Sequence, residues 1–259
     1  SLIGNKMKKF ITLLAITSLF IGCEIDEDLN NDPNAFTDSP IGLILNHALL
    51  NVVAISEAEP ARITSIFTDQ LSGFDRQYAT LNLYSVTSAT YEEAWADALL
   101  AGVSQAQVAK AKAIEVGNSQ IQGITEILEG YYFAETALLF GDIPFSEVNN
   151  LDFPDPVYES QATVMNGAIA LIQAGIQKAG SVSASNNVFS TSSTWSQIGN
   201  ALLARYNLAL GNNSAALAAA KAANFTSTDN DWDIIHSTTN YMENLFWMFE
   251  IEERQDYLR

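Results

Sequence analysis

The chain has 259 residues but only one cysteine, Cys23, so no disulfide can form within it. Small exported domains that depend on a disulfide framework are therefore excluded. A chain of this length can bury enough apolar surface to fold without such crosslinks. The single thiol is free to carry a modification.

Positive charge is scarce: 12 lysines and arginines stand against 30 aspartates and glutamates, a net charge of −18. Residues 1–22 hold three of the lysines and no acids, so without them 9 basic residues face 30 acidic ones, a net charge of −21. A protein of this charge does not neutralise phosphates, which excludes nucleic acid as a partner. Basic residues cannot hold it to an anionic membrane either, so membrane attachment requires a lipid.

Residues that commonly bind metals or catalyse reactions are also few. His47 and His236 are far apart and belong to no HExxH or paired Cys/His pattern, so we expect no metal site. The aspartates at 229, 231 and 233 alternate as in a calcium loop, but the required glycine and glutamate are missing. No GxSxG elbow, phosphate loop or dinucleotide fingerprint occurs. We therefore expect no catalytic residues, no cofactor and no enzyme activity.

The N-terminal region has the pattern of a secretory signal. The sequence MKKFITLLAITSLFIGC has two lysines, an apolar stretch, and then Gly22 and Cys23. The apolar stretch is shorter than the roughly 20 residues that cross a bilayer, which argues against a membrane helix. Its end resembles the L-x-G-C lipoprotein box, in which the cysteine is diacylated. We expect a signal peptide over residues 1–22, with residues 1–6 upstream of the start codon, and an acidic lipoprotein tether over residues 23–36.

Apolar residues at three- and four-residue spacing indicate helices almost throughout residues 37–259. A cap, a proline or a capping box marks helix starts at Ser39-Pro40, Thr90–Glu93, Ser119, Ser160, Thr194–Gln197 and Ser214. Glycine is expected to end two of these helices, at Gly141 and Gly211. No stretch alternates as a sheet requires, so we predict an all-α fold.

Two polar, irregular segments, residues 181–194 and 224–244, are expected to be exposed loops. The second carries Trp232 and Tyr241, and aromatic rings in such a loop favour ligand contact. Trp95 and Trp195 fall at apolar helix positions, so we expect them in the core. The remaining, weaker aromatic candidates are Tyr78, Tyr84 and Trp247.

Residues 203–223 match half of a tetratricopeptide repeat, which is a pair of packed helices. Leu203-Ala204 takes the small-residue contact and Gly211 the turn between the helices. Ala216 and Ala223 are the two alanines seven residues apart that let the paired helices touch. We expect a tetratricopeptide-like helix pair here.

Three segments read together resemble the SusD/RagB family. Residues 123–148 run GITEILEGYYFAETALLFGDIPFSEV, a helix with a tyrosine-rich centre that ends in Leu-Phe-Gly-Asp-Ile-Pro-Phe. The other two segments are residues 157–164 (VYESQATV) and the helix pair within residues 195–223. In the first segment, Asp142 is expected to bond the backbone freed at the helix end, and Phe145 to fold back as an apolar plug.

The resemblance implies a SusD-like helical domain in a nutrient-binding surface lipoprotein. Such a protein binds an oligosaccharide or a peptide by aromatic stacking and hydrogen bonds, and delivers it uncleaved to a SusC-like TonB-dependent outer-membrane transporter. The acidic residues after Cys23 are similar to the signal that sends Bacteroidetes lipoproteins to the outer face of the cell. The alternative is a tetratricopeptide-like scaffold lipoprotein that contacts proteins and binds no small molecule.

Family members are about twice this length, and Glu252–Arg259 resembles a mid-chain passage of theirs. We therefore expect residues 37–259 to be a helical domain that is truncated at its C-terminal end.

The lipid anchor can be tested directly. Cys23→Ala removes the only sulfur that can be acylated, so the protein should move from the membrane to soluble fractions and lose incorporation of labelled palmitate. Unchanged membrane association of the variant would show that the anchor is not at Cys23.

Overall fold

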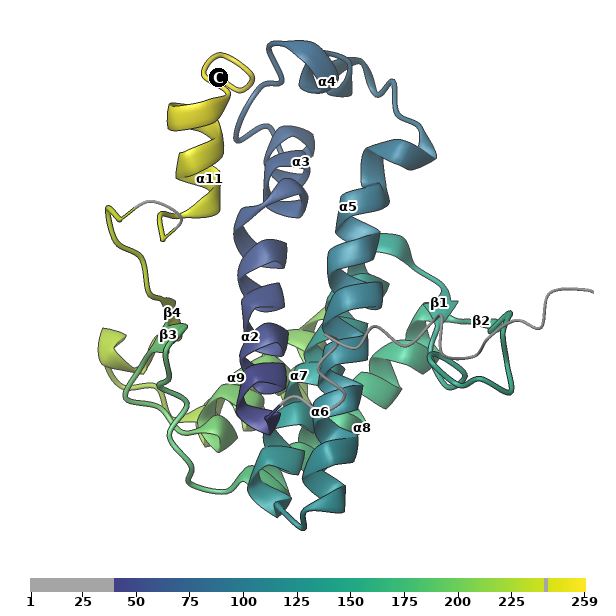
Figure 1. Ribbon diagram of the computed structural model, residues 1–259, viewed down its shortest axis with the longest axis vertical. Helices are drawn as coiled ribbons and strands as arrows, with labels where there is room; N and C mark the ends of the chain where they lie inside the picture. Colours follow the sequence, from purple (N-terminus) through teal and green to yellow (C-terminus); the bar gives the residue numbers. More distant parts are fainter. Residues whose placement is uncertain (1–39, 240–241) are drawn as a thin grey trace, which may run out of the picture. The chain divides into compact units, whose positions relative to one another are not determined.

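The computed structural model describes residues 40–239 and 242–259 (Figure 1). The expected signal peptide and tether, Cys23 and Tyr241 lie outside the described residues. The α-helices are α2 (Ile41–Glu57), α3 (Glu59–Phe67), α4 (Arg76–Ala79), α5 (Glu92–Trp95), α6 (Ser104–Glu115), α7 (Ser119–Phe140), α8 (Gln161–Ala179), α9 (Trp195–Ala209), α10 (Asn213–Ala223) and α11 (Leu245–Trp247).

Shorter elements connect these helices. The 3-10 turns are η2 (Leu81–Leu83), η3 (Ser88–Tyr91) and η5 (Thr228–Asn230), and the π-helical segments are η4 (Ala96–Val103) and η6 (Met248–Glu253). The strands are two-residue pieces: β1 (Ile143–Pro144), β2 (Tyr158–Glu159), β3 (Phe189–Ser190) and β4 (Asp233–Ile234). The all-α prediction is therefore confirmed.

The strands form two antiparallel pairs, β1 with β2 and β3 with β4. The second pair joins the two segments predicted as separate exposed loops, since Phe189 lies opposite Ile234. The ring of Phe189 is buried. These segments are thus tied to each other and partly to the core.

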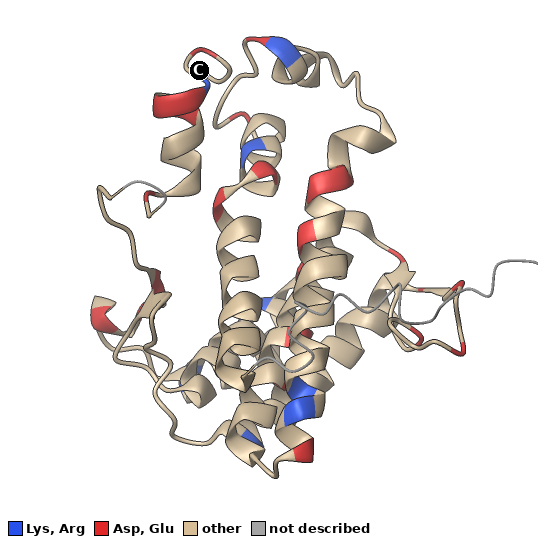
Figure 2. Ribbon diagram, in the orientation of Figure 1, with Lys and Arg blue, Asp and Glu red and all other residues tan. Residues whose placement is uncertain are grey.

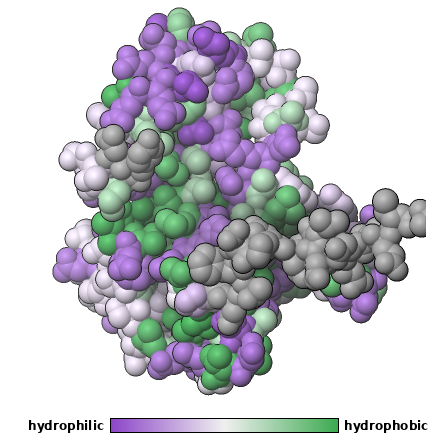
Figure 3. All heavy atoms as spheres, in the orientation of Figure 1, coloured by the Kyte–Doolittle hydropathy of each residue, from purple (hydrophilic) through white to green (hydrophobic). Residues whose placement is uncertain are grey.

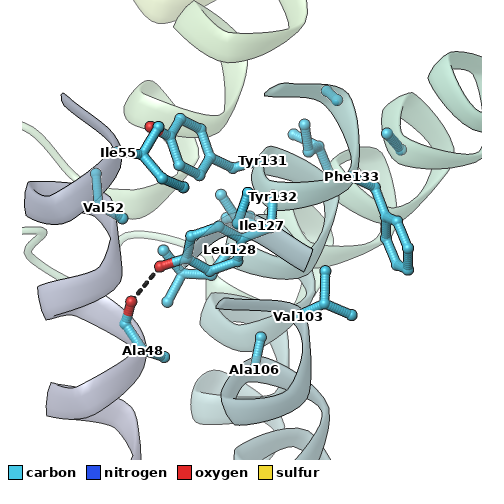
Figure 4. Close-up of a cluster of buried hydrophobic side chains, with 14 of the residues drawn as sticks. Ala48, Val52, Ile55, Val103, Ala106, Ile127, Leu128, Tyr131, Tyr132 and Phe133 are labelled. Carbon is cyan, nitrogen blue, oxygen red and sulfur yellow. Dashed lines mark hydrogen bonds between the residues drawn. The ribbon is translucent and has the colours of Figure 1, made fainter. Parts of the chain in front are cut away.

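Helix α7 lies at the centre of the described domain. Every residue from Gly123 to Ala137 is buried. Helix α7 packs on α6, α8 and η4, and also touches α2 and α9. The Tyr132 hydroxyl donates a hydrogen bond to the carbonyl of Ala48 in α2, inside an apolar cluster (Figure 4). Ile124, Leu128 and Tyr131 face inward as predicted, but Leu138 is exposed.

Three glutamates within this buried stretch pair with cations from three different helices. Glu126 pairs with Lys178 of α8 at 2.6 Å, and Glu135 with Arg205 of α9 at 3.0 Å. Glu129 pairs with Lys110 of α6. A buried carboxylate is costly unless it is paired, so each pair favours one placement of its helix against α7.

Helices α7 and α8 approach each other closely at glycines. A Cβ built on Gly123 would lie 2.3 Å from the amide nitrogen of Ala179 and 2.6 Å from the carbonyl oxygen of Gly175. One on Gly175 would lie 2.5 Å from the carbonyl oxygen of Gly123. The two backbones are therefore in direct contact, which only glycine permits.

Helices α9 and α10 form the predicted tetratricopeptide-like pair. Gly211 makes the turn with φ +76°, a left-handed conformation that favours glycine. Leu203, Ala216 and Ala223 are buried between the helices or against the core, as expected. The capping box at Thr194 and Gln197 starts α9 as predicted.

Two local predictions are wrong. The capping box lies not at Thr90–Glu93 but three residues earlier: Thr87 is the cap, and the Thr90 hydroxyl accepts from its backbone N–H at 3.1 Å. Asp142 does not bond the backbone freed at the end of α7. Its carboxylate accepts from the N–H of Gln161, at 2.9 Å, and so holds the first turn of α8.

A smaller cluster of buried residues forms where α3 meets the last residues of the described chain. Its members are Ile63, Ile66, Tyr78, Leu81 and Leu258.

Glu57 connects the end of α2 to two later parts of the chain, at His236 and Leu245. Its carboxylate contacts His236 at 2.7 Å and accepts from the N–H of Leu245 at 3.2 Å.

Residues 41–67 are long and apolar enough to cross a bilayer by composition, but α2 packs on α6 and η4 as a core helix does.

The contact between α7 and α8 gives a stability test. Gly123→Ala should lower the free energy of unfolding by about 1–3 kcal/mol, because its Cβ overlaps backbone atoms that cannot move aside. Gly42→Ala is the matched control, since nothing lies within 4 Å of a Cβ there, and it should raise stability by about 0.5–1 kcal/mol. Urea unfolding followed by circular dichroism measures both, and equal effects would contradict the close approach.

Candidate functional site

Three neighbouring hollows lie around the start of α5 and the end of α7. The largest has a volume of about 660 Å³, the second about 500 Å³ and the third about 220 Å³. Trp95 lines the first two, while Tyr91 and Phe140 line the second and third. Because they share lining residues, the three hollows adjoin one another. Together we call them the aromatic face.

Trp95 is the central residue of the aromatic face. Its indole is half-buried and meets the ring of Phe140 edge-on, with centroids 5.2 Å apart and planes at 90°. The residue ends α5 where the helix turns into the π-helical segment η4. Within η4, Leu99 and Leu100 line the same hollow as Trp95. π-Helical segments are rare and often occur at functional sites.

The opposite wall of the largest hollow is the loop between β1 and β2. This wall exposes apolar side chains to solvent: Leu151 and Phe153 of the loop are 97% and 45% exposed, and Tyr158 of β2 is 66% exposed. Figure 3 shows that apolar side chains also reach the surface elsewhere on the drawn face of the molecule. Exposed aromatic and apolar residues gathered around a hollow are typical of a binding surface.

Side chains from elsewhere fix the position of this loop. Asn149, with φ +59°, donates from its amide to Ser104 at 3.0 Å and to Gln107 at 2.8 Å. Glu147 accepts from the N–H of Val157 at 2.8 Å, which closes the loop across its base. The apolar side chains are therefore presented by an anchored loop.

The third hollow continues toward α3. Phe67 lines it and stacks on Tyr84, with centroids 5.9 Å apart and planes at 5°. Tyr84 is 77% exposed and has φ +53°. Stacked and edge-on rings of this kind offer flat apolar surfaces to a ligand.

Acidic residues border the aromatic face. Figure 2 shows them on α5 and at the junction of α2 and α3. Burial raises the pKa of Glu93, and the neighbouring carboxylate of Glu59 raises it further. Burial also raises the pKa of Asp97. The site therefore combines apolar walls with hydrogen-bond acceptors and excess negative charge, which suits neutral ligands better than anions.

A family model described as "Starch-binding associating with outer membrane" and named SusD-like matches residues 33–257. The chain belongs to the SusD-like family. The family predicted from the three sequence segments is thereby confirmed. Comparison with curated proteins gives no match.

Solved SusD-like structures share the fold. A SusD/RagB family protein from Bacteroides thetaiotaomicron VPI-5482 has a TM-score of 0.68 and 18% identity, over 82% of this chain and 48% of its own. A Bacteroidetes AC2a SusD-like protein has a TM-score of 0.63 and 16% identity, over 82% and 44%. A SusD superfamily protein from Bacteroides vulgatus ATCC 8482 has a TM-score of 0.59 and 14% identity, over 74% and 44%. This SusD-like chain thus spans a little under half the length of these relatives.

Trp232, predicted as a ligand contact, packs in the structure against two other rings. It stacks on Phe189 with centroids 4.0 Å apart and meets Trp195 edge-on at 5.4 Å. Its side chain is half-buried, and its indole nitrogen is buried with no hydrogen-bond partner among the described residues. A ligand role for Trp232 stays a prediction, as does one for Tyr241, which lies outside the described residues.

Some of the other aromatic candidates are buried in the structure and others are exposed. Trp195 is buried, as expected, and Trp247 and Tyr84 are exposed. Tyr78 is fully buried in the smaller cluster, and its hydroxyl donates to Glu59, so it is not an exposed candidate. Trp95 was expected in the core but lines two hollows. The helical spacing of Trp95 predicts a core residue, and half of its ring is indeed buried.

Trp232 can be tested for a structural role. Trp232→Ala should lower the free energy of unfolding by about 2–4 kcal/mol, somewhat less than a fully buried ring, because it removes the stack on Phe189. Trp232→Phe keeps a ring against Phe189 and should recover most of that loss. If both variants melt like the parent protein, the ring is dispensable for packing and its ligand role gains support.

Proposed function

We propose that the chain belongs to a cell-surface lipoprotein that binds a nutrient and delivers it to a SusC-like TonB-dependent outer-membrane transporter. The nutrient is an oligosaccharide or a peptide. The family match over residues 33–257, whose description is starch-binding and outer-membrane association, is the observation that carries this proposal.

The aromatic face supports binding. Sugar rings expose C–H faces and peptides expose apolar side chains, and both pack well on rings such as those of Trp95 and Tyr158. The three hollows lie side by side, so they can take successive units of an oligomeric ligand. The net charge of −18 repels anionic ligands, so neutral ligands fit the site better.

The proposed location follows from the N-terminal sequence. The signal resembles that of a lipoprotein, so Cys23 would carry the lipid and the acidic residues after it would direct the protein to the outer face of the outer membrane. The chain's net negative charge would otherwise keep it away from an anionic surface. Lipid therefore supplies the attachment, and the helical domain is free to face its ligand and the transporter.

A scaffold role is the second candidate. The helix pair α9–α10 exposes Leu208 and Leu217, at 63% and 58%, as a protein-binding helix pair would. On this alternative the protein contacts other proteins and binds no glycan or peptide.

Binding can be tested with the full-length lipoprotein in detergent on a glycan array and a peptide pool. Once a ligand is found, Trp95→Ala and Tyr158→Ala should each weaken it about tenfold or more, or about 1.4 kcal/mol, by removing a stacking surface. Phe225→Ala is the control: it removes an aromatic ring that is 40% exposed and lines none of the three hollows, so it should leave binding unchanged.

Ligand and products should be analysed together. The proposal expects ligand to be recovered intact, and cleavage products would instead show an enzyme. A folded protein that retains no glycan or peptide supports the scaffold alternative. Equal binding by Trp95→Ala, Tyr158→Ala and the parent would move the site off the aromatic face, with Trp232 and Tyr241 the next proposed contacts.

A further inference from the structure

A fourth hollow, of about 290 Å³, differs in chemistry from the aromatic face. It lies where the end of α2 and the start of α3 meet α7 and α9, and its polar lining includes Ser56, Tyr131, Glu135 and Arg205. Figure 4 shows Tyr131 lying beside Ile55, another lining residue. It shares Pro60, Thr64 and Leu139 with the smallest aromatic hollow, so the two are neighbours.

A buried carboxylate forms the inner part of this hollow. The side chain of Glu135 is 10% exposed. One of its oxygens accepts from Arg205 at 3.0 Å and the other from the Tyr206 hydroxyl at 2.8 Å. Burial raises the pKa of Glu135, and the nearby Arg205 guanidinium and Tyr206 hydroxyl offset only part of that rise.

A guanidinium forms the outer part. The side chain of Arg205 is 58% exposed, and it uses one of its five N–H donors on Glu135 in the part of the chain that the structure describes. Donors therefore remain on its exposed edge. The side chains of Ser56, which is exposed, and Tyr131, which is buried, also line the hollow and add two hydroxyl groups to it.

The hollow thus presents a negative group inside and a positive group outside, 3.0 Å apart. A simple cation would be repelled by Arg205, and a simple anion by Glu135 and by the charge of the whole chain. A ligand that carries an ammonium and a carboxylate on the same carbon can satisfy both groups, because each of its charges then faces an opposite one.

We propose that this hollow binds a free α-amino acid as its zwitterion. The ammonium group lies against Glu135, Ser56 and Tyr131, and the carboxylate lies against the outer edge of Arg205. Leu139 and Pro60 offer apolar walls for a small side chain. The charged residues of this site, Glu135 and Arg205, line none of the three aromatic hollows, so the amino-acid proposal can be tested independently of the oligomer-binding proposal.

The test is calorimetric titration of the full-length lipoprotein with L-serine, L-alanine and L-leucine. At least one should bind with a Kd of about 1 mM or tighter. N-acetyl-L-serine lacks the ammonium, serinol lacks the carboxylate, and dialanine separates the two charges, so each should bind at least tenfold more weakly. Absence of amino-acid binding would overturn the proposal, as would N-acetyl-L-serine, serinol or dialanine binding as tightly as the amino acids.

Variants locate the binding. Glu135→Gln and Arg205→Met should each weaken the amino acid about tenfold or more, since each removes one charge of the pair. Ala61→Leu fills the hollow from α3 while leaving Glu135 and Arg205 in place, and it should abolish binding. It tests the site even if a charge variant fails to fold. Ala218→Leu is the matched control on the exposed surface of α10 and should bind normally.

The aromatic face supplies a second control. Tyr158→Ala should leave amino-acid binding intact, because Tyr158 lines a different hollow. Normal binding by folded Ala61→Leu would place the amino acid elsewhere and refute the assignment.

Discussion

The buried glutamates of α7 are the constraint on which the fold and its surfaces depend. A helix enclosed over fifteen residues can carry Glu126, Glu129 and Glu135 only if neighbouring helices bring a cation to each. Those cations come from α6, α8 and α9, in a chain that has few to spare. The ion pairs act together with the glycine contact between α7 and α8 to oppose a shift of α7, because a shift leaves a charge buried without a partner.

Two of these pairs organise the surface at the candidate sites. The Glu129 carboxylate accepts from Lys110 and from the amide of Gln107, at 2.9 Å from the latter. The oxygen of the Gln107 side chain then accepts from Asn149, which anchors the loop that exposes Leu151 and Phe153. A core carboxylate thus orients an amide, and the amide positions a surface loop. The Glu135 pair ends in an exposed guanidinium in the same way and shapes the polar hollow.

Local signals were predictable from the sequence, and pairings between distant segments were not. The Thr194 capping box and the stop at Gly141 depend on residues within one turn, so the sequence shows them directly. The strand pair β3–β4 joins residues more than 40 positions apart, and each strand alone is too short to show alternation. The prediction for Trp95 was wrong for a related reason. Helical spacing identifies the face of a helix that packs on the core, but it does not show how far along the helix a neighbouring element covers that face. The hollows could not have been predicted, since each is lined from several elements.

The position of the aromatic face follows from where α7 leaves the core. Burial is complete up to Ala137, and Leu138, Leu139 and Phe140 then emerge before Gly141 ends the helix with φ +81°. The last turn still carries the apolar residues of a core helix, but these residues are exposed or only partly buried. Trp95 and Tyr91 partly cover Phe140, and what they leave open is the aromatic face, while Leu139 contributes a wall to the polar hollow. Both candidate sites are therefore built on one exposed helix end, and a ligand at either completes the burial that the fold begins.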